Sequence, residues 1–352
     1  MSPRTTTDVT APARMRSYHV DSGAGIDGLT LREHPVPAPG PGQVLVAVRA
    51  VSPSYRDLLV LGGRYVLPVR PDVVPVAEGA GEVVALGPGV DTVLVGDRVT
   101  ASLFPSWQDG PFGLLHLPQL GGTLDGLLTE YALLDAHALV PVPAHLSYAE
   151  AATLPCVAVT AWNALTGDGG LRPGQTVVTQ GSGGVSLFAL QLARALGARV
   201  VATTSGPAKA ARLAALGADR VVDYRAEPDW PAAVRDATGG AGADRVVDVV
   251  GRLDESVRAV ALGGHIAMVG FVSETAPPID ARRLFASGAV LRPVAVGSRA
   301  QFRELTKVVE QHRIRPVIDR SFPFDRAVDA FRHYASGSAF GKVVIELPPP
   351  AA

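Results

Sequence analysis

Residues 174–204 read GQTVVTQGSGGVSLFALQLARALGARVVATT, and this stretch decides the fold. The β-branched run at 176–180 stops at a glycine, and apolar side chains then recur every three or four residues as far as Gly197. A second apolar run at 199–203 follows that glycine. The stretch therefore predicts a strand, a glycine turn, a helix and a second strand.

The glycine turn has the composition of a diphosphate-binding site. Glycines let the backbone come close to phosphates, and a helix N-terminus offers free N–H groups and a partial positive charge. The strict pattern of three glycines is missed, because Ser186 stands at the third position. A turn with only a packing role is the alternative, but the place between a strand and a helix favours dinucleotide binding. The expected phosphate contacts are Gly181, Ser182, Gly183, Gly184 and Val185.

Composition bounds the class of protein. The 352 residues suffice for two domains, and the 47% hydrophobic content supplies full cores. A net charge of −1 gives no electrostatic argument for nucleic acid or an anionic membrane as a partner. One cysteine, Cys156, excludes an intrachain disulfide and a multi-cysteine zinc cluster. No run has the length of a membrane helix or the pattern of a signal peptide, so we expect a cytoplasmic protein.

The chain before the glycine turn has a different sequence pattern. Residues 1–13 are polar and threonine-rich, and we expect them to be disordered. Short apolar runs cut by Gly and Pro then continue to residue 143, which predicts a partly open antiparallel β-structure. Strands are expected at 43–51, at 81–86 and after the turn at 95–99.

The chain around and beyond the glycine turn alternates between helices and strands. Ser147 and Glu150 form a capping box at the start of a helical pattern that runs to residue 165. The alternation predicts a doubly wound parallel sheet with right-handed crossovers. Further strands are expected at 220–224, 245–250, 265–270 and 290–296.

These elements and several local sequences resemble the medium-chain dehydrogenase/reductase superfamily. The resemblance rests on VGDRV (95–99), AATLPCVAVTAWNAL (151–165), QGSGGVSLFALQLARALGA (180–198), LGADRVVDYR (216–225) and FGKVVIEL (340–347). It covers nearly the whole chain after about residue 15 and is greatest with the zinc-independent branch, which includes zeta-crystallin-like quinone oxidoreductases and enoyl reductases. A short-chain dehydrogenase would need Tyr-x-x-x-Lys, which this sequence lacks.

The resemblance implies an α/β protein of two domains. A Rossmann domain that binds NADP(H) would span 144–315. A GroES-like, mostly antiparallel catalytic domain would combine 14–143 with 316–352, where a helix at 324–334 and a strand at 342–347 complete it. Such proteins commonly form homodimers through an apolar edge strand, here 290–296, although Pro293 removes one donor from that edge.

A catalytic zinc ion can be tested by its ligands. Zinc alcohol dehydrogenases that this chain resembles have a cysteine where it has Ser54, a histidine where it has Ala77 and a third ligand at Cys156. Catalytic zinc needs three protein ligands, and Asp57 and Glu78 with one thiol would be an unusual set. We therefore expect no metal.

The segment 52–57 resembles the Asn-Tyr-Arg-Asp segment of the zinc-independent branch, with Ser54 in place of the asparagine. Tyr55 could donate a proton and Arg56 could stabilise an enolate oxygen. Alternatively, Tyr55 packs while Arg56 and Asp57 form an ion pair that braces the loop. Tyr65 matches a tyrosine that lines the nicotinamide cleft, or it packs with its hydroxyl in solvent.

The choice between NAD and NADP depends on the end of the strand at 199–203. NAD enzymes place an acid there, and this chain has Thr204 and Ser205. Lys209 follows one turn later, unless it is simply a surface lysine, and Tyr224 matches a tyrosine that contacts the 2′-phosphate in the quinone reductases. By resemblance, further cofactor contacts are Thr160, which otherwise caps its own helix, Gly270, Phe271 and Lys342.

Three functions remain open at this point. The first is a zinc-independent NADPH-dependent reductase of activated alkenes, enones or quinones. The second is a zinc-free alcohol dehydrogenase or ketoreductase, and the third is a non-catalytic NADPH-binding protein. Aromatic and apolar residues between 102 and 122, including Phe104, Trp107, Phe112 and Leu114, suggest a small lipophilic substrate.

Overall fold

The computed structural model describes residues 12–273, 275 and 277–349. The chain forms two compact units, one of Met1–Cys156 with Ser298–Ala352 and one of Val157–Gly297. The expected disordered tail lies outside the described residues, except for residues 12 and 13, which precede the first strand. No helix in the described part of the chain is long and apolar enough to cross a membrane.

The unit Val157–Gly297 contains a six-stranded parallel sheet in the order β10-β9-β8-β11-β12-β13. Its strands are β8 (Thr176–Gln180), β9 (Arg199–Thr204), β10 (Arg220–Asp223), β11 (Ala243–Asp248), β12 (Val260–Met268) and β13 (Val290–Pro293). Its helices are α3 (Val159–Thr166), α4 (Gly184–Ala195), α5 (Pro207–Ala215), α6 (Trp230–Ala237), α7 (Leu253–Ala259) and α8 (Ala281–Ser287). The strand order reverses between β8 and β11, as in a doubly wound sheet, and the predicted fold class is confirmed.

The core of this unit explains why its strands read as continuous apolar runs. All five residues of β8 are buried, because helices cover both faces of a parallel sheet. Val178, Val201 and Ile266 from three strands pack in one cluster with Trp230 and Val234 of α6. The alternation of strands and helices in the sequence therefore predicted the layers correctly.

Two strands of this sheet differ from the prediction by three residues or more at one end. β12 begins at Val260, five residues before the expected start, because Val260 pairs with Ala243 before a register shift. β13 ends at Pro293, short of the expected residue 296, where proline removes a ladder donor and Val296 has a φ of 54°.

The other unit is built on a seven-stranded, mostly antiparallel sheet. Its order is β14-β15-β3-β4-β5-β7, with β6 paired to β3, and only β14 and β15 run parallel to each other. The strands are β3 (Gln43–Val51), β4 (Gly79–Leu86), β5 (Arg98–Ala101), β6 (Tyr131–Asp135), β7 (Leu139–Pro141), β14 (Ile318–Pro323) and β15 (Lys342–Glu346). A separate antiparallel pair is formed by β1 (Arg14–His19) and β2 (Thr30–Pro35). The predicted antiparallel domain is confirmed, and the C-terminal segment completes it.

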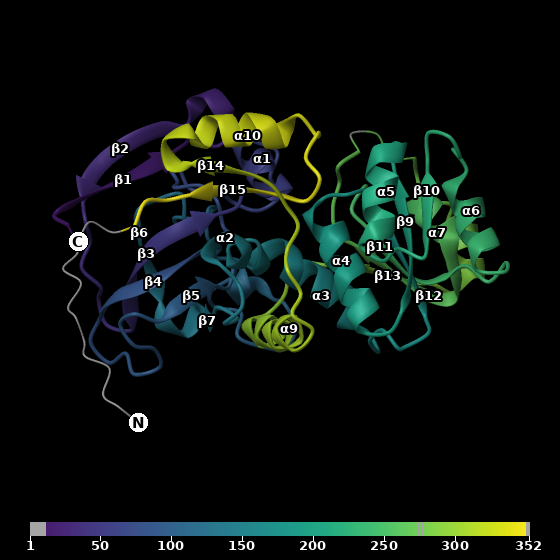
Figure 1. Cartoon of the computed structure of the whole chain (residues 1–352), viewed down its shortest axis with the longest axis horizontal. Coiled ribbons are helices and arrows are strands. Elements are labelled where there is room, and N and C mark those ends of the chain that lie inside the picture. The colour runs from purple at the N-terminus through teal and green to yellow at the C-terminus, as the bar shows by residue number, and fades with distance from the viewer. Residues whose placement is uncertain (1–11, 274, 276, 350–352) are drawn as a thin grey trace. The chain divides into compact units, whose positions relative to one another are not determined.

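In the described part of the chain, four α-helices accompany these strands. They are α1 (Tyr55–Leu61), α2 (Tyr148–Ala151), α9 (Arg299–Gln311) and α10 (Ala327–Ala335), and α10 packs on β14 and β15 (Figure 1). α2 has the predicted capping box, with Ser147 N 2.8 Å from Glu150 Oε2 and Glu150 N 3.2 Å from Ser147 Oγ. The expected helix to residue 165 is interrupted, because the chain widens into a π-helical turn at Leu154–Ala158, which includes Pro155.

The compact units are divided differently from the predicted domains. The sequence placed 144–315 in one domain, whereas 144–156 and 298–315 group with the antiparallel unit. The physical reason is packing: α2 contacts β3 and β4. At the start of α9, Arg299 donates its N–H to Trp107 O and its Nε to Leu139 O, each at 2.9 Å.

Candidate active site

The glycine turn is shaped to receive a diphosphate. Gly181 has a φ of 76°, and Cβ atoms added to Gly181 or Gly183 would meet no described atom within 4 Å. α4 begins at Gly184, and no side chain in the described part of the chain caps its first N–H groups. The Ser186 hydroxyl donates to Gln180 O at 2.6 Å and ties the strand end to the helix. The turn therefore fits the phosphates of a dinucleotide, with free N–H groups and open space.

A buried carboxylate holds the loop that follows β11. Asp248 Oδ1 accepts hydrogen bonds from Val250 N (2.9 Å) and Gly251 N (2.7 Å), and its Oδ2 accepts from Ser256 Oγ (2.6 Å). Gln180, at the end of β8, accepts from Val250 N at 3.3 Å. These bonds fix the strand ends on either side of the switch point, where doubly wound sheets bind nucleotides. Sequence reasoning missed Gln180, because its partner Val250 lies in another segment. It also missed Asp248, although the partners of that carboxylate are local.

The end of β9 carries the residues expected to select the cofactor. Thr204 is 1% exposed, and its Oγ1 has no hydrogen-bond partner among the described residues. Tyr224, 43% exposed, donates its N–H to Thr204 O at 3.0 Å, while Ser205 and Lys209 are half-buried. The sequence missed Asp223, which lies beside Thr204 in register on β10. An acid therefore stands at this edge, contributed by the neighbouring strand.

The remaining expected cofactor contacts divide between the two units. Gly270 donates its N–H to Asp248 O at 3.3 Å, and Phe271 is 54% exposed beside it, so both lie at the strand ends described above. Thr160 is buried within α3. Lys342 belongs to the antiparallel unit, where it is 1% exposed and its Nζ lies 2.6 Å from Glu78 Oε2. Its partners in that unit suit a bracing role better than the predicted cofactor contact.

The start of α1 is a buried hydrogen-bonded turn. Asp57 Oδ2 accepts from Ser54 N (2.8 Å) and Ser54 Oγ (2.9 Å), and Asp57 Oδ1 accepts from Arg56 Nη1 (3.1 Å). Asp57 is 1% exposed and Arg56 is 9% exposed, whereas Tyr55 is half-buried. The geometry matches the bracing ion pair that the sequence left open, so Asp57 orients Arg56 rather than facing a substrate.

Arg56 and Tyr65 meet at a residue that the sequence did not single out. Gln119 is fully buried, and its Oε1 accepts from Arg56 Nη2 (3.1 Å) and from the Tyr65 hydroxyl (2.9 Å). Burial acts to lower the pKa of Arg56, but the charge of Asp57 together with the contributions of Tyr65 and Cys156 outweighs it, and the pKa is raised. Burial raises the pKa of Tyr65, and Arg56 opposes part of that rise. The cluster thus contains a fixed cation and a phenol that keeps its proton.

A second tyrosine, Tyr334 of α10, also reaches this region. Its hydroxyl lies close to the backbone of Tyr55, the first residue of α1. Burial raises the pKa of Tyr334, and the nearby charges of Glu78 and Asp57 add to the effect. Tyr334 is a proton-bearing group near the candidate catalytic residues that no motif in the sequence identified.

The positions that would bind zinc do not fit a metal ion. Ser54 Oγ donates to Asp57, Ala77 has no donor atom, and Cys156 is buried with a raised pKa because burial and the charge of Glu78 oppose its ionisation. Within the described residues, no group of three His, Cys, Asp or Glu side chains is arranged to hold a metal. Three such ligands are the minimum for a catalytic zinc site, and these positions do not supply them.

The aromatic residues expected to line a substrate pocket pack on one another. The Phe112 ring lies 4.9 Å from that of Phe104 and 4.8 Å from that of Trp107, between centroids. Phe104 and Trp107 are buried, whereas Leu114 is 84% exposed. The cluster makes this loop rigid and apolar, and Leu114 faces solvent.

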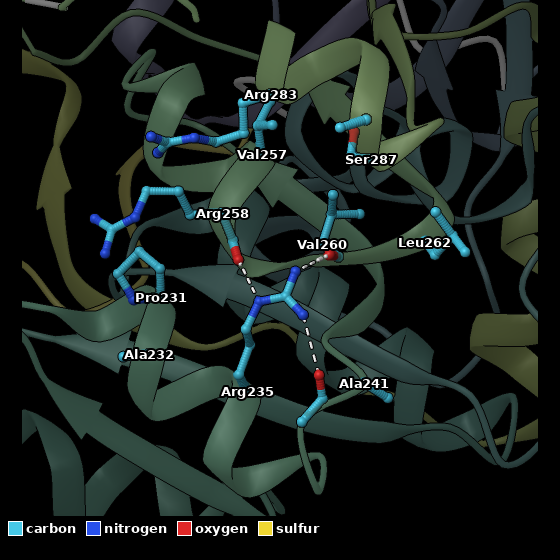
Figure 2. A pocket seen from close by; sticks show the side chains of 12 residues that line it. Pro231, Ala232, Arg235, Ala241, Val257, Arg258, Val260, Leu262, Arg283 and Ser287 are labelled. Carbon is cyan, nitrogen blue, oxygen red and sulfur yellow. Dashed lines mark hydrogen bonds between the residues drawn. The ribbon is translucent and has the colours of Figure 1, made fainter.

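A pocket of about 640 Å³ in the parallel unit is separate from the cofactor turn (Figure 2). Arg235 lines it and donates to the carbonyls of Arg258 (2.8 Å), Gly240 (3.0 Å) and Val260 (3.0 Å). Gly240 precedes β11 and Val260 begins β12, so the pocket lies at the amino ends of these strands. The glycine turn follows the carboxyl end of β8, and we therefore do not assign the cofactor to this pocket.

Family models match both parts of the chain. Residues 40–144 match the alcohol dehydrogenase GroES-like domain, and residues 184–311 match the zinc-binding dehydrogenase family. A zinc-type alcohol dehydrogenase-like protein of Schizosaccharomyces pombe is 40% identical over 93% of this chain and 97% of its own length. An acryloyl-coenzyme A reductase of Metallosphaera sedula is 31% identical over 90% of this chain and 96% of its own length.

Solved structures with the same fold include proteins that use either nicotinamide cofactor. A candidate alcohol dehydrogenase of Sinorhizobium meliloti has a TM-score of 0.89 and 38% identity, over 96% of this chain and 100% of that one. An NAD-dependent alcohol dehydrogenase has a TM-score of 0.86 and 33% identity, and the match covers 95% of this chain and 100% of that one. A mycobacterial protein in complex with NADPH has a TM-score of 0.79 and 28% identity, and the match covers 94% of this chain and 99% of that one.

Proposed function

The chain belongs to the medium-chain dehydrogenase/reductase superfamily and is an NAD(P)-dependent oxidoreductase, and we propose that it is a zinc-independent, NADPH-dependent reductase of an activated alkene, enone or quinone. The observation that carries the proposal is the combination of an open phosphate turn at Gly181 with a Ser54–Ala77–Cys156 set that cannot ligate zinc. In a zinc-dependent alcohol dehydrogenase, the metal acts as the Lewis acid that stabilises the alkoxide. Reduction of a conjugated double bond needs only a hydride donor and a proton source.

The choice of NADPH rests on the residues at the ends of β9 and β10. Thr204 and Ser205 stand where an acid would accept from the ribose hydroxyls of NAD. Lys209 and Tyr224 offer a cation and a phenol to a 2′-phosphate. Asp223 beside Thr204 opposes this preference, so we expect it to be moderate.

The roles of the chain's own residues follow from their bonds. When bound, the reduced nicotinamide supplies the hydride. Arg56 holds a positive charge in a buried setting, where it stabilises negative charge on a substrate oxygen more than in water. Tyr65 keeps its proton, and Gln119 sets the direction of its O–H bond. Asp57 positions Arg56, and its carboxylate accepts three hydrogen bonds in doing so.

The names of three similar proteins bear on the substrate. The acryloyl-coenzyme A reductase acts, by its name, on a conjugated double bond. The alcohol dehydrogenase-like relatives favour the second candidate, a zinc-free alcohol dehydrogenase or ketoreductase. The lipophilic character of the substrate remains a proposal that rests on the apolar 102–122 segment.

A panel assay separates the candidates. Purified protein is mixed with NADPH and enones, quinones or aldehydes, and with NADP⁺ and simple alcohols. Loss of NADPH absorbance with enones or quinones alone supports the proposal. Reversible turnover of simple alcohols would establish the second candidate, and tight NADPH binding without turnover of any compound would indicate a non-catalytic binding protein.

A further inference from the structure

Three separate segments carry the positions at which zinc members of the family have metal ligands. Ser54 precedes α1, Ala77 precedes β4, and Cys156 lies in the π-helical turn after α2. A metal bound at all three positions would cross-link these segments. Here no metal fits, so another interaction has to fix their spacing.

The ion pair between Glu78 and Lys342 contacts all three segments. Lys342 Nζ donates to Glu78 Oε2 at 2.6 Å and to Pro53 O, the residue before Ser54, at 2.9 Å. Glu78 follows Ala77 directly, and its Oε1 accepts from Cys156 N at 2.8 Å. Lys342 and Glu78 therefore join the three segments through their mutual ion pair and through bonds to Pro53 O and Cys156 N. Lys342 also attaches the segments to β15, of which it is the first residue.

The ion pair between Glu78 and Lys342 is almost completely buried. The side chains of Lys342 and Glu78 are 2% and 0% exposed. Buried ion pairs often stabilise a fold no better than apolar residues of the same size, because both charges lose their water. A contribution to stability is thus a weak explanation for the presence of this pair. A role in fixing the geometry of the three segments explains its particular bonds.

Resting on the function proposed above, we propose that Glu78 and Lys342 are positioning residues that hold the Ser54–Asp57 turn and the Cys156 turn in their catalytic arrangement without touching the substrate. The pair provides the cross-link that a metal would provide at these positions. It acts through the main chain of Pro53 and Cys156 and takes no part in hydride or proton transfer.

The test uses the double variant E78L/K342M, which replaces both charges with apolar groups of similar size. Main-chain and side-chain bonds from Ser52 to Glu78 O (3.0 Å) and Val343 O (2.7 Å) do not need the two charges, so we expect the variant to fold. Amide exchange at Cys156 should accelerate by at least about tenfold, because its N–H loses its acceptor. The kcat for enone reduction should fall by about tenfold to a hundredfold, with the Kd for NADPH unchanged. K342R should retain most of the kcat and most of the protection of the Cys156 amide from exchange.

The control is R16M/E130L, which removes an ion pair with a 2.7 Å contact in the same unit. It should leave exchange at Cys156 and kcat unchanged. The proposal would be overturned if E78L/K342M left amide exchange at Cys156 and kcat unchanged. It would also be overturned if the control accelerated exchange at Cys156 as much as E78L/K342M does. If E78L/K342M does not fold, E78Q is measured for kcat alone, because a glutamine oxygen can still accept from Cys156 N. A fall in kcat would support the proposal, and an unchanged kcat would overturn it. If the natural protein proves to have no reductase activity, the function proposed above fails, and exchange at Cys156 still decides whether the pair acts as a brace.

Discussion

Arg56 and Tyr65 lie against each other, with the guanidinium carbon 4.8 Å from the ring centroid, and both donate to Gln119 Oε1. A guanidinium at this distance is attracted to the face of the ring. One buried amide oxygen thus decides where the cation and the phenol point. The two side chains act as a unit whose geometry depends on Gln119.

Replacing Gln119 with leucine should lower kcat by about tenfold. The substitution removes the shared acceptor and leaves two buried donors without a partner, so Arg56 and Tyr65 reorient. Steady-state kinetics with NADPH and an enone measure the effect. The control is Q108L, whose Nε2 donates to Pro105 O instead, and it should keep full activity. If Q119L matched the natural protein in kcat, the cluster would have no role in the reaction.

Removal of metal should not affect turnover. Ser54 and Ala77 leave Cys156 with too few neighbouring ligands for catalytic zinc. Dialysis against EDTA or phenanthroline should therefore leave kcat unchanged, and elemental analysis should find less than stoichiometric zinc. Activity that is lost on chelation and returns with added zinc would show that a metal site exists.

The protein should bind NADPH more tightly than NADH, by about tenfold to a hundredfold, because charged hydrogen bonds to a phosphate are strong. S205D should remove most of this preference by placing a carboxylate near the 2′-phosphate. D223N should increase it, since Asp223 lies beside Thr204. Fluorescence titration with both cofactors gives the affinities. Equal affinity of the natural protein for the two would refute the NADPH assignment.

The protein should form a homodimer through β13. This strand ends the sheet order, and Val290 is 43% exposed, as are Leu262 (83%) and Phe285 (90%) in neighbouring segments. An apolar sheet edge of this kind suits an isologous contact, although Pro293 removes one donor. Light scattering should report twice the chain mass of 36.5 kDa. F285D should shift the protein toward the monomer.

A matched control for the dimer is L115D, because Leu115 is 87% exposed in the other unit. It should not change the mass in solution. A monomeric natural protein, or equal effects of both variants, would rule out the contact through β13.

The fold was readable from the sequence where its signals are local. β3 begins and ends at the predicted residues, and the turn at Gly181 joins a strand to a helix as its glycines indicate. The Ser147 capping box was equally clear. Each of these features depends on residues a few positions apart, so spacing alone identifies them.

The site was less readable because its bonds join distant residues. Lys342 and Glu78 are 264 positions apart, and Tyr65 and Gln119 are 54 apart. Asp223 faces Thr204 only through the pairing of β9 with β10. A spacing rule cannot bring such residues together, so they appear only when the chain is folded.

Deuterium transfer tests the proposed reaction in one measurement. The protein, freed of metal, is given NADPH labelled with deuterium at the transferred position and an enone, and mass spectrometry locates the label in the product. We predict a saturated ketone with deuterium at the β-carbon, formed at the same rate with and without added zinc. An unsaturated alcohol with deuterium at the carbonyl carbon, or transfer that requires zinc, would contradict the proposed function.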